Sequence, residues 1–214
     1  IGSFYTLPKS YNFSIEAFYK TLSNVITDKK FSSIQEPAVH WEDLFELGKG
    51  TAYGLEFFAE KNYGKTTGWF AYTLSKAERQ FKNMNDGKAF PYEFDRRHSL
   101  NIVINQKFSD KIDMGIVWVY SSGRNITLPD GQYISNFGLT NGTNSGDNNY
   151  IPVQSDINEY KVPSYNRLDI GLNFHKHKKW GVRTWSMGLY NAYNHHNSFL
   201  IYVDCDKIRK EEKV

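Results

Sequence analysis

The 214-residue sequence has a single cysteine, Cys205, and no apolar run of 18 or more residues. One cysteine excludes an internal disulfide and a thiolate metal cluster. The lack of a long apolar run excludes a transmembrane helix, but the alternating strands of a membrane barrel would average out in the mean hydropathy of −0.59. Neither sign of charge dominates, since 26 basic residues balance 23 acidic ones, so the net charge of +3 gives no argument for nucleic-acid binding.

Signals at the amino terminus are also missing. Residues Ile1 to Tyr5 include no start methionine, no basic segment and no apolar signal core, so we expect no targeting signal and a chain cut from a longer protein. Aromatic residues, in contrast, are abundant, with 15 Tyr, 15 Phe and 5 Trp making up 16% of the chain. This content is high for an ordinary soluble domain and predicts a role for aromatics besides filling a core.

The clearest pattern is a long hairpin from Leu100 to Tyr120, in which apolar and polar residues alternate on both sides of the turn Ser109-Asp110-Lys111. One face carries Leu100, Ile102, Ile104, Phe108, Ile112, Met114, Ile116, Trp118 and Tyr120. A period of two places these side chains on one side of a sheet. Soluble strands average about five or six residues, whereas a strand that crosses a bilayer needs about 9 to 11. The length therefore indicates a membrane.

The same alternation recurs along the chain and predicts strands at residues 11–28, 51–61, 66–80, 164–175 and 182–204. Tight connections at 8–10, 62–65, 109–111 and 176–180 alternate with long ones at 29–47, 81–96 and 123–163. Antiparallel neighbours then place every tight turn at one rim and every long loop at the other, as in outer-membrane barrels. The sequence predicts an all-β fold: a partial, up-and-down transmembrane β-barrel of about eight antiparallel strands, with short periplasmic turns and long extracellular loops.

Several passages resemble the barrel strands of TonB-dependent outer-membrane receptors. They are Gly48 to Phe58, Gly68 to Ser75, Phe94 to His98 and Pro163 to Gly171. Asn191-Ala192-Tyr193-Asn194 is similar to a motif on the penultimate strand of those barrels. The resemblance covers nearly the whole chain, and the motifs follow the family's order and spacing.

The resemblance implies a plugged barrel of about 22 strands, in which residues 1–214 form the C-terminal portion while the plug domain and the closing strand are absent from the sequence. It also implies a location in the bacterial outer membrane and TonB-dependent uptake of a scarce nutrient, which could be a siderophore, glycan, peptide or vitamin. Outer-membrane lipid, the TonB complex acting through the absent N-terminal plug region, and a surface lipoprotein are the implied partners. Neither nucleic acid nor an enzymatic reaction is expected.

Aromatic residues supply the candidate sites. Five residues of the long loops are candidate ligand contacts: His40, Trp41, Tyr92, Tyr133 and Phe137. Four aromatics towards strand ends are candidates for the girdle at the membrane interface: Tyr72, Phe108, Trp118 and Tyr120. For each of these residues, packing within its own loop or within a core is the alternative.

We expect no catalytic residue, cofactor or metal. His195 and His196 are adjacent, so on a strand they point to opposite faces and cannot hold one metal ion. His175 and His177 belong to a basic turn, for which we expect contact with lipid headgroups at the periplasmic rim. Val117 and Val119 do not fit the polar face of their strand, and we expect them to pack against the plug.

Two other classes of protein remain open. A small stand-alone outer-membrane barrel, acting as an adhesin or structural anchor, would have to close on itself without a plug. A secreted β-sandwich that binds glycans through exposed aromatics would be soluble without detergent.

Overall fold

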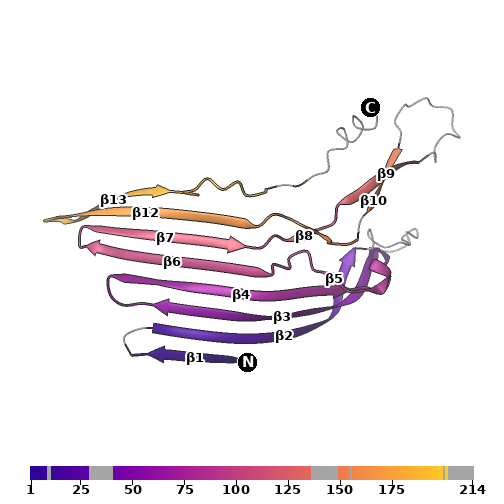
Figure 1. The fold of residues 1–214 in the computed structure, drawn as a ribbon, viewed down its shortest axis with the longest axis horizontal. Coiled ribbons are helices and arrows are strands. Elements are labelled where there is room, and N and C mark those ends of the chain that lie inside the picture. Colours follow the sequence, from indigo (N-terminus) through magenta and orange to yellow (C-terminus); the bar gives the residue numbers. More distant parts are fainter. Residues whose placement is uncertain (9–10, 29–40, 136–148, 155, 200, 202–214) are drawn as a thin grey trace.

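The computed structural model describes residues 1–8, 11–28, 41–135, 149–154, 156–199 and 201. Its main feature is one antiparallel sheet of nine strands, in the order β1-β2-β3-β4-β6-β7-β12-β13, with the short strand β5 paired to β4 (Figure 1). Its strands are β1 (Gly2–Leu7), β2 (Tyr11–Asp28), β3 (Phe45–Lys61), β4 (Thr66–Gln80), β5 (Phe90–Pro91), β6 (His98–Ser109), β7 (Ile112–Ser121), β12 (Tyr165–Lys178) and β13 (Gly181–Leu189). Eight of these strands follow one another across the sheet, so the prediction of an all-β, up-and-down fold is confirmed. Among the described residues the two edge strands, β1 and β13, do not pair with each other, so the sheet is open.

The two ends of the sheet differ in their connections. Tight turns join β3 to β4, β6 to β7 and β12 to β13, and all of them lie at the left end in Figure 1, where β1 ends and β2 begins. The long connections lie at the opposite end. We call these the short-turn end and the loop end. The predicted separation of tight turns from long loops is therefore confirmed.

The register of the strands gives the sheet one apolar face, because directly paired residues in adjacent strands lie on the same face. One row across the sheet contains Tyr5, Phe13, Ala59, Phe70, Ile102, Trp118 and Leu168. The next row on the same face contains Ser3, Ile15, Phe57, Tyr72, Leu100, Tyr120 and Asn166. The alternation read from each strand thus adds up to one continuous surface, which we call the apolar face.

The opposite side of the sheet, the polar face, carries residues of the other parity. They include Asn12, Ser14, Glu16, Glu56, Glu60, Thr73, Asn101, Asp113, Asp169 and Asn173. A few apolar side chains interrupt it. Val117 pairs with Val103, which in turn pairs with Trp69, and the Trp69 ring stacks with Phe58 at 6.3 Å between ring centroids. Val117 therefore belongs to a local apolar band on this face, whereas Val119 pairs with the polar Asn101 and Arg167.

Both faces of the sheet are largely uncovered. Within the described residues, the buried apolar side chains are Phe81, Met84 and Phe90, and all three lie at the loop end. Many large apolar side chains of the apolar face are exposed, among them Phe13, Ile15, Phe57 and Phe70. In the part of the chain that the structure describes, no second sheet packs on this layer, which departs from the β-sandwich alternative. An apolar surface of this extent marks a contact with lipid or another protein.

The long connections contain short elements of their own. The segment after β2 includes the 3₁₀ helix η2 (Trp41–Leu44), and the one after β4 includes η3 (Asn85–Gly87). Between β7 and β12, β8 (Asn125–Ile126) pairs with β11 (Tyr160–Lys161), and β9 (Pro129–Ser135) pairs with β10 (Asn149–Gln154). Among the described residues no helix is long and apolar enough to cross a membrane.

Three strand boundaries differ from the sequence-based expectation. β3 starts at Phe45 instead of residue 51, because residues 45–50 continue to pair with β2. β12 runs to Lys178, which shortens the expected turn at 176–180 to two residues. β13 ends at Leu189, well before residue 204.

The end of β13 also corrects the placement of the Asn191 to Asn194 motif, which lies beyond the strand and not on it. Asn191 and Asn194 both have positive φ, 52° each, a conformation that Asn tolerates better than most residues. The side chain of Asn191 holds the turn, since its Oδ1 accepts a hydrogen bond from His195 N at 3.1 Å and its Nδ2 donates to His195 O at 2.9 Å.

Candidate functional site

A β-bulge near the loop end of β2 turns side chains onto the polar face. The register with β3 shifts between Ser23 and Val25, and Asn24 between them has a positive φ of 56°. Before the bulge, odd-numbered residues of β2 lie on the apolar face. After it, Val25 pairs with Gly48, and Thr27 with Glu46, on the polar face. The bulge therefore redirects Val25 and Thr27 towards the interior side of the sheet, a common use of bulges beside binding sites.

An apolar cluster is built on this part of the polar face. Phe81, Met84 and Phe90 are 3%, 2% and 5% exposed, and Val25 and Ile157 pack against them. The rings of Phe81 and Phe90 stack with centroids 6.0 Å apart. Phe81 lies so close to Gly48 that a Cβ there would come within 2.3 Å of the ring. A glycine is needed at this position so that the connection after β4 can fold inward over the sheet.

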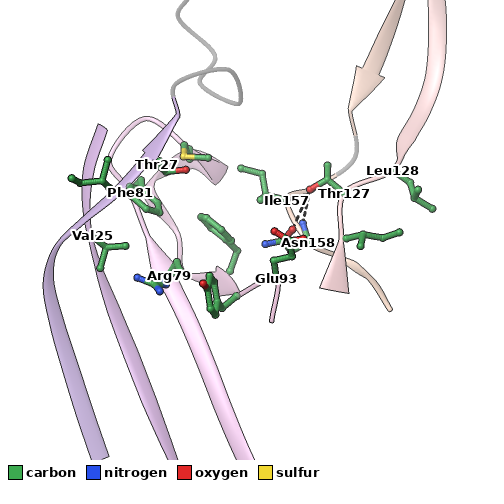
Figure 2. A pocket seen from close by; sticks show the side chains of 14 residues that line it. Val25, Thr27, Arg79, Phe81, Glu93, Thr127, Leu128, Ile157 and Asn158 are labelled. Atoms are coloured by element: carbon green, nitrogen blue, oxygen red, sulfur yellow. Dashed lines mark hydrogen bonds between the residues drawn. The ribbon is translucent and has the colours of Figure 1, made fainter. Parts of the chain in front are cut away.

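Next to this cluster lies a pocket of about 500 Å³, which we call the loop-end pocket (Figure 2). Val25, Thr27, Arg79 and Phe81, from β2 and the end of β4, line one side of it, and Thr127, Ile157 and Asn158 line the other (Figure 2). Its remaining lining residues are Ile26, Met84, Phe90, Tyr92, Glu93, Ile126 and Leu128. Small-molecule sites commonly have such a largely apolar wall with a few polar groups.

Charged and aromatic groups give the pocket wall its polarity. The Arg79 guanidinium lies 4.2 Å from the centroid of the Tyr92 ring, within the range of a cation–π contact. Arg124 Nη1 donates to Glu93 Oε1 at 3.0 Å, so this carboxylate is already paired. The hydroxyl of Thr127 accepts a hydrogen bond from Asn158 N at 3.0 Å. The pocket thus presents apolar surface, an aromatic ring and a guanidinium.

The backbone around the pocket is held by hydrogen bonds from polar side chains. Asp95 Oδ1 accepts a hydrogen bond from Ala77 N in β4 at 2.7 Å. The buried Asn125 donates from Nδ2 to Tyr92 O at 3.2 Å, and Asn158 Nδ2 donates to Pro91 O at 2.9 Å. Arg96 donates from Nη1 to Ser121 Oγ at 3.0 Å. The segment Phe94 to His98 therefore fastens the connection after β4 to β4 and to the end of β7, which gives its motif a structural role.

A second polar group lies at the opposite, short-turn end of the polar face. Asn173 Nδ2 donates to Asp113 Oδ1 at 2.8 Å, and His175 contacts both Asp113 Oδ2 and, at 2.8 Å, Thr184 Oγ1. Ser186 Oγ donates to Asn173 Oδ1 at 2.7 Å. These bonds link β7, β12 and β13 side by side. Each member is already satisfied by a neighbour, so the group connects strands and shows no sign of a catalytic arrangement.

The five residues expected to contact a ligand are only partly brought together. Tyr92 lines the loop-end pocket. Trp41 is the first residue of η2, and Tyr133 lies in β9 opposite Ile151. His40 and Phe137 lie outside the described residues. Of this set, Tyr92 alone is shown at a pocket, and the ligand role of all five remains a prediction.

Three of the four expected interface aromatics belong to the apolar face, and the fourth, Phe108, lies at the register shift between Lys107 and Ser109. Tyr72 and Tyr120 lie in one cross-strand row with Leu100, and Trp118 lies in the next row towards the short-turn end. Phe108 lies next to the short turn and is 52% exposed. Polar ends of two of these aromatics are satisfied, since Tyr72 OH bonds His98 Nδ1 and Trp118 Nε1 donates to Asn166 Oδ1, each at 2.8 Å. The girdle role of these four aromatics stays a prediction.

The expectation for His175 and His177 needs correction. His175 and His177 lie in β12 and not in a turn, and His175 bonds to Asp113 and Thr184 on the polar face, so it does not point to lipid. Within the described residues, no group of three or more His, Cys, Asp or Glu side chains could hold a metal ion.

Most residues of the loop-end pocket were missed in the sequence. No motif connects the pocket residues Arg79, Phe81, Phe90 and Asn158, because they come from separate segments. The sequence around residue 24 also contains no pattern that indicates the bulge redirecting Val25. A weak signal did exist, since Gly48 and the paired aromatics of the segment after β4 stand out in composition.

Comparison with known proteins identifies a family for most of the chain. Residues 3–194 match the family model described as TonB dependent receptor-like, beta-barrel. No curated protein and no solved structure matches the chain.

Proposed function

Since the chain belongs to the TonB-dependent receptor-like β-barrel family, we propose that it takes part in the TonB-dependent uptake of a scarce nutrient, with the loop-end pocket as part of the nutrient site. The family consists of transport receptors of the bacterial outer membrane and not of enzymes. The chain is accordingly an outer-membrane β-barrel protein. The nutrient, its contacts and the partners are the proposed part.

The observation that carries this proposal is the position of the loop-end pocket. It lies at the end of the sheet where the long connections gather, and its wall is built on the polar face. In outer-membrane barrels long loops are extracellular, and the polar face looks into the interior. A nutrient arriving from outside would therefore meet the pocket before the interior of the barrel.

The chemistry of the pocket favours a nutrient with an apolar or aromatic group. Phe81, Phe90 and Ile157 offer contact area, and the ring of Tyr92 with the guanidinium of Arg79 offers a stacking surface. Siderophores, peptides, vitamins and glycans each contain members that fit this description. Trp41, His40, Tyr133 and Phe137 are proposed as further contacts from the other long loops.

The two faces of the sheet suit the same proposal. The continuous apolar face is the surface that lipid would cover, and the polar face would line an interior filled by a plug. The apolar band that includes Trp69, Val103 and Val117 would pack against this plug. We place residues 1–214 in the C-terminal portion of the barrel, with TonB acting through the plug region and a surface lipoprotein as a further partner.

A growth assay tests the transport function. The gene for the full-length receptor is deleted, and the strain is grown on a panel of media in which one iron source, glycan, peptide or vitamin limits growth. Growth should fail on one medium, recover when the receptor gene is restored, and fail again when TonB is also deleted. Equal growth of the deletion strain on every medium, or recovery without TonB, would contradict the proposal.

Pocket variants then test the site in the same strain. Tyr92→Ala removes the ring but keeps the carbonyl that Asn125 bonds, so the fold is retained while aromatic contact is lost. An aromatic contact is worth about 0.5 to 1.5 kcal/mol, so half-saturation of uptake should rise about two- to tenfold. Tyr63→Ala, in the turn after β3, removes an equally large ring far from the pocket and is the matched control. Unchanged uptake in Tyr92→Ala would remove the pocket from the nutrient site.

A further inference from the structure

The apolar face changes character abruptly at the short-turn end of β12 and β13. Phe174 pairs with Trp185 in the last apolar row of this hairpin. The next pair on the same face is Lys176 with Arg183, and Lys178 with Gly181 follows. Because side chains of one parity share a face, these three cations lie directly beyond the aromatic row, on the side of the sheet that faces lipid.

Cations and aromatic rings are in direct contact in this region. The Arg183 guanidinium lies 5.6 Å from the centroid of the Trp185 ring, which is 61% exposed. The same arrangement occurs between β2 and β3, towards the other edge of the sheet, where Lys61 Nζ lies 5.8 Å from the centroid of the Tyr11 ring. Lys61 and Tyr11 are directly paired, on the apolar face, next to a short turn. A cation against an aromatic ring therefore occurs twice along the same edge of the apolar face.

Carboxylates of the described residues do not neutralise the cations of this hairpin. Among the described residues, the acidic side chains at the short-turn end of the neighbouring β6–β7 hairpin are engaged elsewhere: Asp110 pairs with Lys107 at 2.8 Å, and Asp113 bonds His175 and Asn173 on the polar face. No described carboxylate forms an ion pair with Lys176, Lys178 or Arg183. The positive charge of this edge is thus available to an anion from outside the chain.

We propose that Lys176, Arg183 and Trp185 form a binding site for the phosphate of an anionic phospholipid in the periplasmic leaflet of the outer membrane. Trp185 lies at the level of the acyl-chain boundary, and its ring holds the Arg183 guanidinium in place. Lys176 and Arg183, side by side on adjacent strands, both reach the phosphate, and the guanidinium contributes two donors in a fixed geometry. Lys178 adds charge at the edge of the site. Because the cations lie next to the apolar rows, the site selects a lipid over a dissolved anion: the acyl chains of the lipid lie against Phe174 and Trp185.

The site does not depend on the nutrient or on TonB, so it can be tested apart from the transport function. The full-length receptor in detergent micelles is incubated with phosphatidylglycerol, with phosphatidylethanolamine or with inorganic phosphate, and retained ligand is measured by native mass spectrometry. The test variant is Lys176→Gln combined with Arg183→Gln. The control variant, Lys20→Gln combined with Lys161→Gln, removes the same charge from β2 and β11, away from the hairpin of β12 and β13.

Phosphatidylglycerol should be retained in preference to phosphatidylethanolamine. A basic residue near an anionic lipid surface contributes a factor of about five in affinity, so the double variant should bind phosphatidylglycerol about 25-fold more weakly while the control variant binds it normally. Equal retention by the double variant and the wild type would overturn the site. Equal retention of the two lipids would overturn its charge selectivity, and displacement of the lipid by equimolar inorganic phosphate would show a free-anion site instead.

Two further measurements keep the test decisive if the double variant does not fold. Arg183→Lys keeps the charge but loses the planar fork, so it should weaken phosphatidylglycerol binding less than Arg183→Gln does. Raising the salt concentration should weaken binding of the wild type, because the site is exposed and its attraction is screened. Binding that is insensitive to both changes would refute a role for these cations.

Discussion

The assignment of the two faces can be tested with two adjacent residues in the middle of β7. Ile116 lies on the apolar face between Ile104 and Ile170, and Val117 lies on the polar face between Val103 and Asp169. Arginine at either position adds the same charge at the same depth. The surroundings differ, since lipid would surround the first side chain and the second would reach the polar interior.

The expected costs differ by a measurable amount. Arginine on the lipid face of a barrel costs about 2 to 4 kcal/mol at the bilayer midplane and about 0 to 1 kcal/mol near the interfaces. Ile116→Arg should therefore lower the folding equilibrium constant about 30- to 900-fold, with 1.36 kcal/mol for each factor of ten. Val117→Arg should stay within about 1 kcal/mol of the wild type, helped by the neighbouring carboxylate of Asp169.

A third variant checks that depth is the cause. Ile112 is on the same face as Ile116 and four residues closer to the short turn. At about 3.4 Å per residue this is about 14 Å along the strand, which brings the side chain near the interface, so Ile112→Arg should cost about 1 kcal/mol or less.

The assay is reversible unfolding of the full-length protein in lipid vesicles with guanidinium chloride, followed by tryptophan fluorescence. The midpoint and slope of each transition give the free energy of unfolding for the three variants and the wild type. A cost of Val117→Arg equal to that of Ile116→Arg would refute the face assignment. Equal costs at Ile112 and Ile116 would refute the membrane as the cause.

Two smaller predictions concern packing and charge. Gly54 leaves room for the Phe18 ring, since a Cβ there would approach it to 2.9 Å and Leu74 O to 2.5 Å, so Gly54→Ala should cost about 1 to 3 kcal/mol in the same unfolding assay. Gly171→Ala, whose Cβ would meet nothing nearer than 4.0 Å, should leave stability within about 0.5 kcal/mol and serves as its control. The hydrogen bond from Lys107 lowers the pKa of Asp110 in the turn after β6, so the stabilisation from this pair is present above the ordinary carboxyl pKa and is lost as the pH falls through the lowered value. The NMR titration midpoint of Asp110 should rise in Lys107→Gln, and an unchanged midpoint would contradict the pairing.

The alternation of apolar and polar residues along the strands made part of the fold predictable from the sequence. In the hairpin of β6 and β7 every second residue is apolar from Leu100 to Ile104 and from Ile112 to Trp118, so over these stretches the local sequence determines which face each side chain occupies. The end of β12 was not predictable in this way. His175 and Lys176 are polar on both sides of the strand, and they remain in β12 because of cross-strand partners, such as Asp113 and Thr184, that come from other parts of the chain.

The loop-end pocket shows the limit more clearly. Tyr92 was a candidate because it is an aromatic residue in a long loop. Trp41 and Tyr133 have the same property, so it does not indicate which residues line the pocket. Arg79 and Asn158 reach the pocket from β4 and from the connection before β12, and only the folded connections bring them together. Pairing between distant segments of this kind leaves no periodic signal in a single sequence.

The register of the sheet also determines where the chain can change length. In the described pairings of the eight strands that run across the sheet, irregularities occur between Ser23 and Val25 and between Lys107 and Ser109, one near each rim. Between them the faces stay in phase from β1 to β13, so a single inserted residue in a strand would exchange the lipid side and the interior side for everything beyond it. Natural variants of this sheet should therefore gain or lose residues in pairs within the strands and one at a time only at the rims. Length variation among relatives would then trace the upper and lower borders of the membrane.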